Sequence, residues 1–232
     1  MARYTAAYSS FVERLEEVEL LRRFALEKEK QDPVNNGSEI SALCRASVVL
    51  LSGHLEAYIK ELGELAIDSL YEKSVPRKEI CSRFFYHISK NYIDEIKDTS
   101  DPGAIGDKIF SFLANDIEFW SRDGSFPASV PAEMFNKGFS NPAFKQIKSY
   151  FNRFGYDTYQ RDLASKLAAN FQYTKNMIEH LVEIRNRIAH GDPSATKTPS
   201  EIKDMIRIVK NFCVETDGVF ASWWKGMFCA IR

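Results

Sequence analysis

The sequence predicts an all-α protein, and two observations carry this prediction. Apolar residues recur at steps of three and four along nearly the whole chain, which is the period of an amphipathic helix, and strand-like alternation is essentially absent. With 232 residues, of which 44% are hydrophobic, the chain is long enough to bury one substantial core. We therefore expect residues 1–232 to form a single domain, a bundle of long antiparallel helices with additional short helices and a loop-rich insert at about 121–143.

The long helices are indicated by their apolar stripes and end signals. A first helix should run over 4–30, with an apolar side made of Phe11, Leu15, Val18, Leu21, Phe24 and Ala25. Ser38 should cap a second helix that reaches Tyr71 and carries the clearest stripe, namely Cys44, Val48, Leu51, Leu55, Tyr58, Leu62 and Leu65. The segment Thr198-Pro199-Ser200-Glu201 is a capping box that should start the last helix, which runs toward Trp223 and Trp224.

The middle of the chain predicts shorter helices. We expect one from Arg77 to Lys97 and another from Ala104 to Trp120. Glycines and prolines then interrupt 121–143, and Asn141 with Pro142 at the first helical position should open a helix to Phe154. Residues 157–190 should form one or two helices, the second with Met177, Leu181, Ile184 and Ile188 on one face.

Charge, cysteine content and motif searches exclude several classes of function. The net charge of −1 gives no general basic field, so an RNA partner would have to be held by a local patch. The four cysteines are scattered and form no C-x-x-C pair, and we see no secretory signal, so we expect a reducing cytoplasm. No apolar run reaches the length of a membrane span. No metal-ligand spacing, phosphate-binding loop or dinucleotide motif occurs, so we expect neither a metal nor another cofactor.

The segment Arg185-Asn186-Arg187-Ile188-Ala189-His190-Gly191 is the strongest functional candidate. It places an arginine, an amide and a histidine at the end of a long amphipathic helix. An imidazole exchanges protons near neutral pH, and a guanidinium grips phosphate oxygens without losing its charge. This set suits phosphodiester chemistry without a metal. The competing interpretation is structural, because a cationic histidine before a glycine also complements the dipole at a helix end.

The motif has a polar residue, Asn186, directly after Arg185, and four residues separate Arg185 from His190. This pattern resembles the signature of the HEPN superfamily of helical ribonucleases. The segment 52–60, Ser-Gly-His-Leu-Glu-Ala-Tyr-Ile-Lys, resembles its bacterial MAE-type subgroup. The resemblance implies a metal-independent endoribonuclease, a toxin or phage-defence effector with a cognate antitoxin or defence partner. His190 would act as general base or acid, Arg185 would neutralise phosphoryl charge, and Asn186 would position the phosphate or the histidine. The alternatives are a catalytically silent HEPN-like adaptor or nucleotide-binding module, and a helical scaffold unrelated to nucleic acid.

Helix geometry bears on how such a site is assembled. At about 100° per residue, Arg185 and His190 point to different sides of one regular helix, whereas Asn186 and His190 share a face. A site that uses both Arg185 and His190 is easier to build where the end of the helix departs from regular geometry, or where a second copy of the helix packs beside the first. The resemblance implies the second arrangement, a homodimer with both motifs facing one cleft. Glu56 is a supporting candidate that would orient Arg185, or else an ordinary pair with Lys60.

Basic residues on and after the motif are candidates for RNA contact. Arg187 lies beside the motif, and Lys203, Arg207 and Lys210 form a stripe on the last helix that would follow phosphates. Lys145 and Lys148 form a smaller stripe. The alternative is that these side chains are simply solvated. Trp223 and Trp224 would either stack on bases or bury against the bundle or a partner chain.

Overall fold

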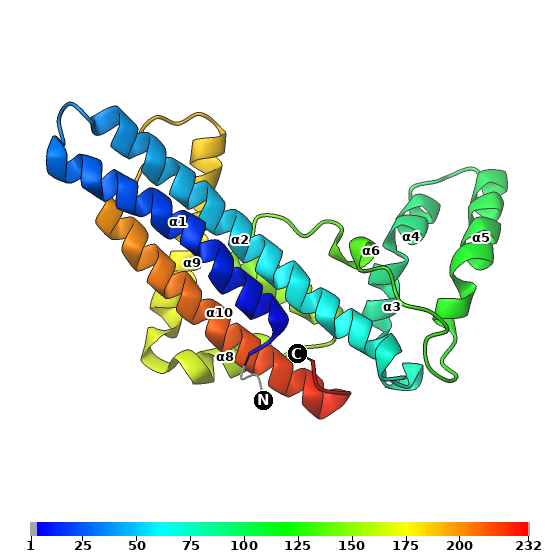
Figure 1. The fold of residues 1–232 in the computed structure, drawn as a ribbon. Helices are drawn as coiled ribbons and strands as arrows, with labels where there is room; N and C mark the ends of the chain where they lie inside the picture. The colour runs from blue at the N-terminus through cyan, green and yellow to red at the C-terminus, as the bar shows by residue number, and fades with distance from the viewer. Residues whose placement is uncertain (1–3, 232) are drawn as a thin grey trace.

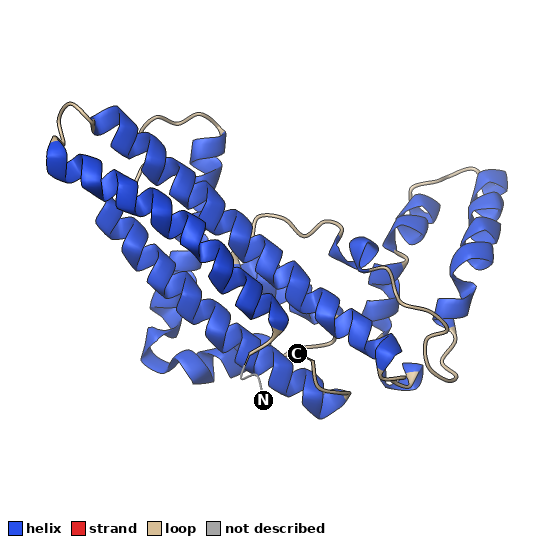
Figure 2. Cartoon of the chain, in the orientation of Figure 1, coloured by secondary structure: helices blue, strands red, loops and turns tan. Residues whose placement is uncertain are grey.

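The computed structural model describes residues 4–231 and contains no strand in that range (Figure 2). The predicted all-α class is confirmed. Three short 3-10 turns lie at Arg77–Glu79, Ile117–Trp120 and Ala168–Asn170. The α-helices are, in chain order, α1 (Ala6–Gln31), α2 (Gly37–Glu72), α3 (Ser82–Ile88), α4 (Lys90–Lys97), α5 (Pro102–Asp116), α6 (Ala132–Asn136), α7 (Phe144–Arg153), α8 (Tyr159–Leu167), α9 (Phe171–Ala189) and α10 (Pro199–Met227).

Four long helices form the bundle that gives the molecule its length (Figure 1). α1 and α2 pack as an antiparallel hairpin, α10 lies against both, and α9 contacts α2 and α10. The predicted stripe of α2 is completely buried from Cys44 to Leu62. Burying such side chains stabilises the fold by about 1.5–3 kcal/mol each. Within residues 4–231, α2 also has the length and composition of a membrane span, but its stripe is used in this core.

The predicted ends of the long helices are confirmed in one case and wrong in another. Thr198 and Glu201 exchange hydrogen bonds between side chain and backbone, so the capping box with Pro199 at the first position starts α10 as predicted. Ser38 does not cap α2, because the helix already begins at Gly37 after Asn36. Phe24, predicted on the apolar side of α1, is 48% exposed.

Residues 75–140, which we call the arm, project from the end of α2 and return to the bundle at α7 (Figure 1). The single helix predicted from Arg77 to Lys97 is wrong, since the chain forms a 3-10 turn, α3 and α4 there. α3 and α4 are separated at Ser89, whose hydroxyl is fully buried. It donates to the Asp116 carboxylate and accepts from Trp120 Nε1 at 2.9 Å. These tertiary bonds separate the two helices.

The second half of the arm differs from the prediction at its helix ends. α5 begins at Pro102, because the Asp101 carboxylate accepts from the backbone N–H of Ala104 at 2.8 Å. The predicted insert 121–143 is irregular apart from the short α6. Asn141 does not open a helix: α7 begins at Phe144, and Asn141 has a φ of +54°, in the left-handed region.

The two tryptophans of α10 pack against other aromatic and polar side chains of the bundle, Trp224 fully buried and Trp223 partly buried. Trp224 is buried, and its Nε1 donates to the Ser69 hydroxyl at 3.0 Å. Trp223 stacks on Tyr156 with ring centroids 4.4 Å apart and an interplanar angle of 8°. The interpretation that they pack against the bundle is therefore confirmed.

Candidate functional site

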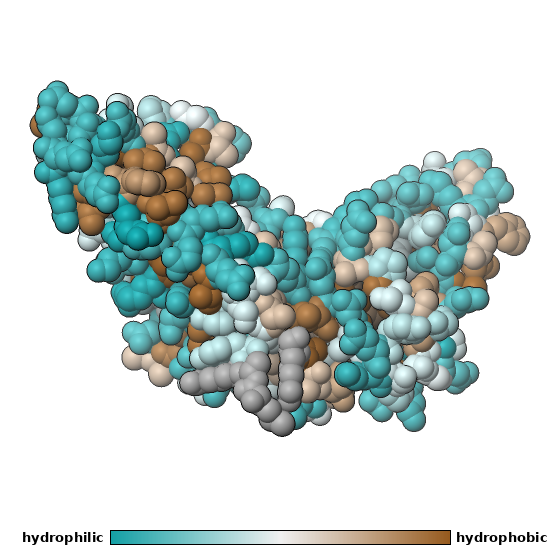
Figure 3. Space-filling view, in the orientation of Figure 1, coloured by the Kyte–Doolittle hydropathy of each residue, from teal (hydrophilic) through white to brown (hydrophobic). Residues whose placement is uncertain are grey.

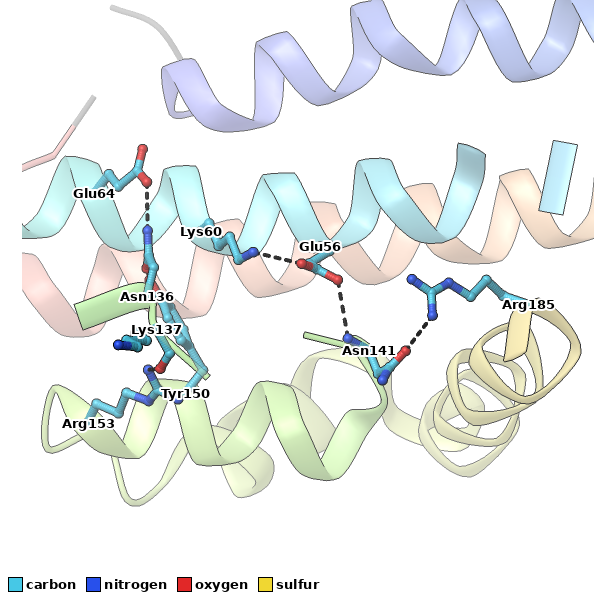
Figure 4. A network of polar contacts seen from close by, with 9 residues as sticks. All are labelled: Glu56, Lys60, Glu64, Asn136, Lys137, Asn141, Tyr150, Arg153 and Arg185. Carbon is cyan, nitrogen blue, oxygen red and sulfur yellow. Dashed lines mark hydrogen bonds and ion pairs between the residues drawn. The ribbon is translucent and has the colours of Figure 1, made fainter. Parts of the chain in front are cut away.

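Arg185 is held by two amide side chains on the arm-facing side of α9. Its Nη1 donates to Asn141 Oδ1 at 2.7 Å (Figure 4). The same nitrogen donates to Asn186 Oδ1 at 3.0 Å, and the side chain is half-buried. Its Nε and Nη2 make no hydrogen bond within residues 4–231. One nitrogen thus fixes the guanidinium, while two remain able to bind an oxyanion as a fork.

Asn141 links Arg185 to Glu56. The backbone N–H of Asn141 donates to Glu56 Oε2 at 3.2 Å, while its side-chain oxygen accepts from Arg185 (Figure 4). Asparagine is one of the few side chains that tolerate the left-handed backbone found here. This conformation lets one residue face two helices, α2 through its backbone and α9 through its side chain.

Glu56 both pairs with Lys60 and connects to Arg185, which are the two arrangements that the sequence suggested as alternatives. Its Oε1 pairs with Lys60 Nζ at 2.7 Å, one turn further along α2, and its Oε2 accepts from Asn141. The side chain is 20% exposed. Glu56 therefore reaches Arg185 through Asn141, and not by a direct ion pair.

Sequence reasoning missed Asn141. The signal was present, because an asparagine before a proline is typical of a turn as well as of a helix start. Its partners lie 85 and 44 residues away in the chain, so no local pattern reveals the link.

His190 lies at the end of α9, exposed to solvent. The helix stops there because Gly191 has a φ of +80°. The N–H groups of Gly191 and Asp192 return to the carbonyls of Ile188 and Arg187, as in a Schellman motif. Within residues 4–231, the imidazole makes no hydrogen bond to Arg185, Asn186 or Glu56. The structure thus brings Arg185, Asn186 and Glu56 together through hydrogen bonds. The His190 imidazole is not part of this side-chain network within residues 4–231, although its backbone N–H donates to the Asn186 carbonyl at 2.9 Å.

The basic candidates for RNA contact divide into two groups. Arg187 is engaged, since it pairs with Asp192 at 2.8 Å and donates to the Ser194 hydroxyl. Bonds from Ser194 and then from Arg187 lower the pKa of Asp192 to about 2. Lys203, Arg207 and Lys210 are all exposed on α10, where Arg207 lies 3.4 Å from Asp204. The predicted stripe is therefore accessible, and Arg187 is tied to its own loop.

Within residues 4–231, no group of three or more His, Cys, Asp or Glu side chains is arranged to hold a metal ion. His54 is largely enclosed between α1 and α2, where burial lowers its pKa. His87 is half-buried on the flank of α3, and burial followed by the nearby Arg153 lowers its pKa to about 4. Both of these histidines lie outside the Arg185 network.

Comparison with known protein families gives a match over most of the chain. Residues 9–222 match the model of the family described as RiboL-PSP-HEPN. Neither curated proteins nor solved structures give a match. The match supports the HEPN superfamily and leaves the MAE-type subgroup a prediction. Because it covers most of the chain, including α2, the Arg185 motif and most of α1 and α10, the chain belongs to the RiboL-PSP-HEPN family of the HEPN superfamily.

Proposed function

We propose that this protein is a metal-independent endoribonuclease of the HEPN type. The observation that carries the proposal is the state of Arg185. Its Nη1 is fixed by Asn141 and Asn186, its other two nitrogens remain available to a phosphate, and its helix ends five residues later at the exposed His190. HEPN domains are often ribonucleases, which favours the same chemistry.

The proposed reaction is an attack of the ribose 2′-oxygen on the neighbouring phosphorus. His190 accepts the 2′-OH proton or donates a proton to the departing 5′-oxygen. The new O2′–P bond forms as the P–O5′ bond breaks, which leaves a 2′,3′-cyclic phosphate and a 5′-OH. Arg185 neutralises the charge that develops on the phosphoryl oxygens, Asn186 positions the phosphate or the histidine, and Glu56 supports the guanidinium through Asn141.

A complete site in this proposal contains two chains. Arg185 and His190 diverge on one helix, and the structure shows no bond between them within residues 4–231. A two-fold dimer would place the His190 of one protomer beside the Arg185 of its partner. Light scattering should therefore show a dimer at micromolar concentration. A fully active monomer would contradict this arrangement.

The biological setting that we propose is cytoplasmic, with a toxin or phage-defence effector restrained by a cognate antitoxin or defence partner. RNA would contact the exposed Lys203, Arg207 and Lys210 of α10. Arg187 would join them after release from Asp192. Substitution of the α10 residues by alanine should weaken binding of all RNA sequences alike and reduce its salt dependence.

The decisive experiment incubates the protein with total RNA in the presence of EDTA and analyses the new ends. We expect cleavage that survives chelation and leaves cyclic phosphates. His190→Ala should abolish cleavage with little effect on stability, and His180→Ala, a partly exposed histidine on the same helix, is the matched control. Activity only with added divalent metal, or a His190→Ala variant that cleaves normally when folded, would overturn the proposal.

A second candidate is a catalytically silent adaptor or nucleotide-binding module. It is favoured by one observation, which is that the His190 imidazole makes no hydrogen bond to the Arg185 network within residues 4–231. This candidate predicts RNA or nucleotide binding that depends on Arg185, without any new RNA ends in the same assay.

A further inference from the structure

A cleft of about 570 Å³ lies between the arm and α2. Lys60 and Glu64 of α2 form one wall, Asn91 of α4 lies opposite, and Glu133 and Lys137 of the α6 region complete it. Figure 3 shows the surface hollowed between the bundle and the arm. The volume falls in the range of small-molecule sites, which are about 300–1,000 Å³.

The cleft is continuous with the Arg185 network through a single side chain. Lys60 lines the cleft, and its Nζ bonds Glu56 Oε1 at 2.7 Å. Glu56, Lys60 and Glu64 follow one another at four-residue steps, so they lie on one side of α2 about 6 Å apart. Figure 4 shows this row with Arg185 at one end and Glu64 and Lys137 at the other. An RNA strand with its phosphate at Arg185 would therefore run along this row into the cleft.

The part of the cleft formed by α6 is held in place by hydrogen bonds to α2 and α7. Asn136 donates to Glu64 Oε1 at 2.6 Å and accepts from the hydroxyl of the fully buried Tyr150. Arg153 donates to the carbonyls of Phe135 and Lys137. These bonds join α2, α6 and α7 around the cleft and hold the carboxylate of Glu64 at its edge.

The polar groups of the cleft fit a nucleobase better than a phosphate. Two ammonium groups, Lys60 and Lys137, face two carboxylates, Glu64 and Glu133, so the formal charges cancel. Glu64 Oε2 and the Glu133 carboxylate make no hydrogen bond within residues 4–231. Acceptors of this kind recognise the exocyclic amino groups of cytosine and adenine, which uracil lacks.

We propose that this cleft is a base-recognition subsite for single-stranded RNA, and that it receives an amino-bearing base, cytosine or adenine, from the strand whose phosphate is held by Arg185. Glu133, Glu64 and the Asn91 amide read the Watson–Crick edge of the base, and Lys60 and Lys137 contact the adjoining backbone. This inference rests on the proposed nuclease function, because it names the preference of the same site.

The test measures binding of His190→Ala protein, which should not cleave, to oligo(C), oligo(A) and oligo(U) of equal length. We expect about tenfold tighter binding of the first two than of oligo(U), in line with the discrimination of a good base contact. Asn91→Ala/Glu133→Ala should abolish this preference. The matched control is Glu95→Ala, which removes an exposed carboxylate from α4 outside the cleft and changes the net charge as Glu133→Ala does.

The outcomes separate the subsite from the nuclease. Equal binding of the three oligonucleotides, or a preference that survives in the double variant, would overturn the subsite even if wild-type protein cleaves RNA. Cytidine monophosphate that binds as tightly as oligo(C) would also overturn it, because the cleft would then be a site for free nucleotides. If the preference appears but wild-type protein leaves total RNA intact, the nuclease proposal fails and base recognition stands.

Discussion

Asn141 shows how one residue in an unusual backbone conformation assembles a site. Its φ of +54° directs the N–H toward Glu56 and the side chain toward Arg185. A residue confined to helical or extended backbone would not make both bonds from this position. The arginine motif is visible in the sequence, whereas the residue that orients the arginine is not.

Substitutions at Asn141 can separate its side chain from its backbone. Asn141→Gly keeps the left-handed conformation and the bond to Glu56 but removes the acceptor for Arg185, so kcat should fall about 10–100-fold with KM little changed. Asn141→Asp retains an acceptor and should stay within about threefold of wild type. Steady-state cleavage of a defined RNA gives both constants. Equal activity of the Gly variant and wild type would show that Asn141 does not position Arg185.

His87 makes the stability of the protein sensitive to acid. Burial and the nearby Arg153 lower its pKa to about 4, while an unfolded histidine titrates near 6.5. Between these values the unfolded state binds more protons, so stability is present above about pH 6.5 and is lost as the pH falls toward 4. Partial exposure reduces the full effect to about 1–2 kcal/mol.

The measurement is urea unfolding at about pH 7 and about pH 5 for wild type and His87→Phe. The phenyl ring can keep the contact that His87 makes with Phe135 and does not titrate. Wild type should lose more stability than the variant between the two pH values, although burial of His54 gives both proteins a further loss of the same sign. An identical pH dependence would contradict the assignment.

At the scale of elements, the sequence predicts the long helices well and the arm poorly. The stripe of α2 and the capping box of α10 are local signals, and both are confirmed. The break at Ser89 depends on Asp116 and Trp120, which lie 27 and 31 residues away. Periodicity alone continues through such a position, because nothing local opposes the helix.

Gly63 and Gly53 give a matched pair within α2. A Cβ on Gly63 would lie 2.0 Å from Tyr150 Oη, so Gly63→Ala must displace a fully buried ring and should cost about 1–3 kcal/mol. A Cβ on Gly53 meets no atom within 4 Å, and Gly53→Ala should stabilise the helix by about 0.5–1 kcal/mol. Denaturant unfolding measures both. The packing argument fails if the two substitutions shift stability in the same direction.

At the scale of the whole molecule, the sequence predicts that the helices share one core but not that 75–140 projects from it. The amphipathic pattern of α5 is real, yet it leaves a row of apolar side chains in solvent. Figure 3 shows apolar surface at the outer edge of the arm over α5. Ile109, Phe110, Leu113 and Ile117 are 39–73% exposed. A periodic stripe indicates a helix face, but it does not say whether anything in the same chain covers that face.

This unequal burial has a consequence for local unfolding. α4 and α5 contain no fully buried residue, whereas α2 and α10 supply much of the core. In native-state hydrogen exchange, we expect the amides of α4 and α5 to open with free energies lower than those of α2 by about 2 kcal/mol or more. Uniform protection across the chain would contradict this. If α4 unfolds locally while the bundle stays folded, Asn91 on α4 separates from Glu64 on α2. The two walls of the cleft therefore belong to different cooperative units.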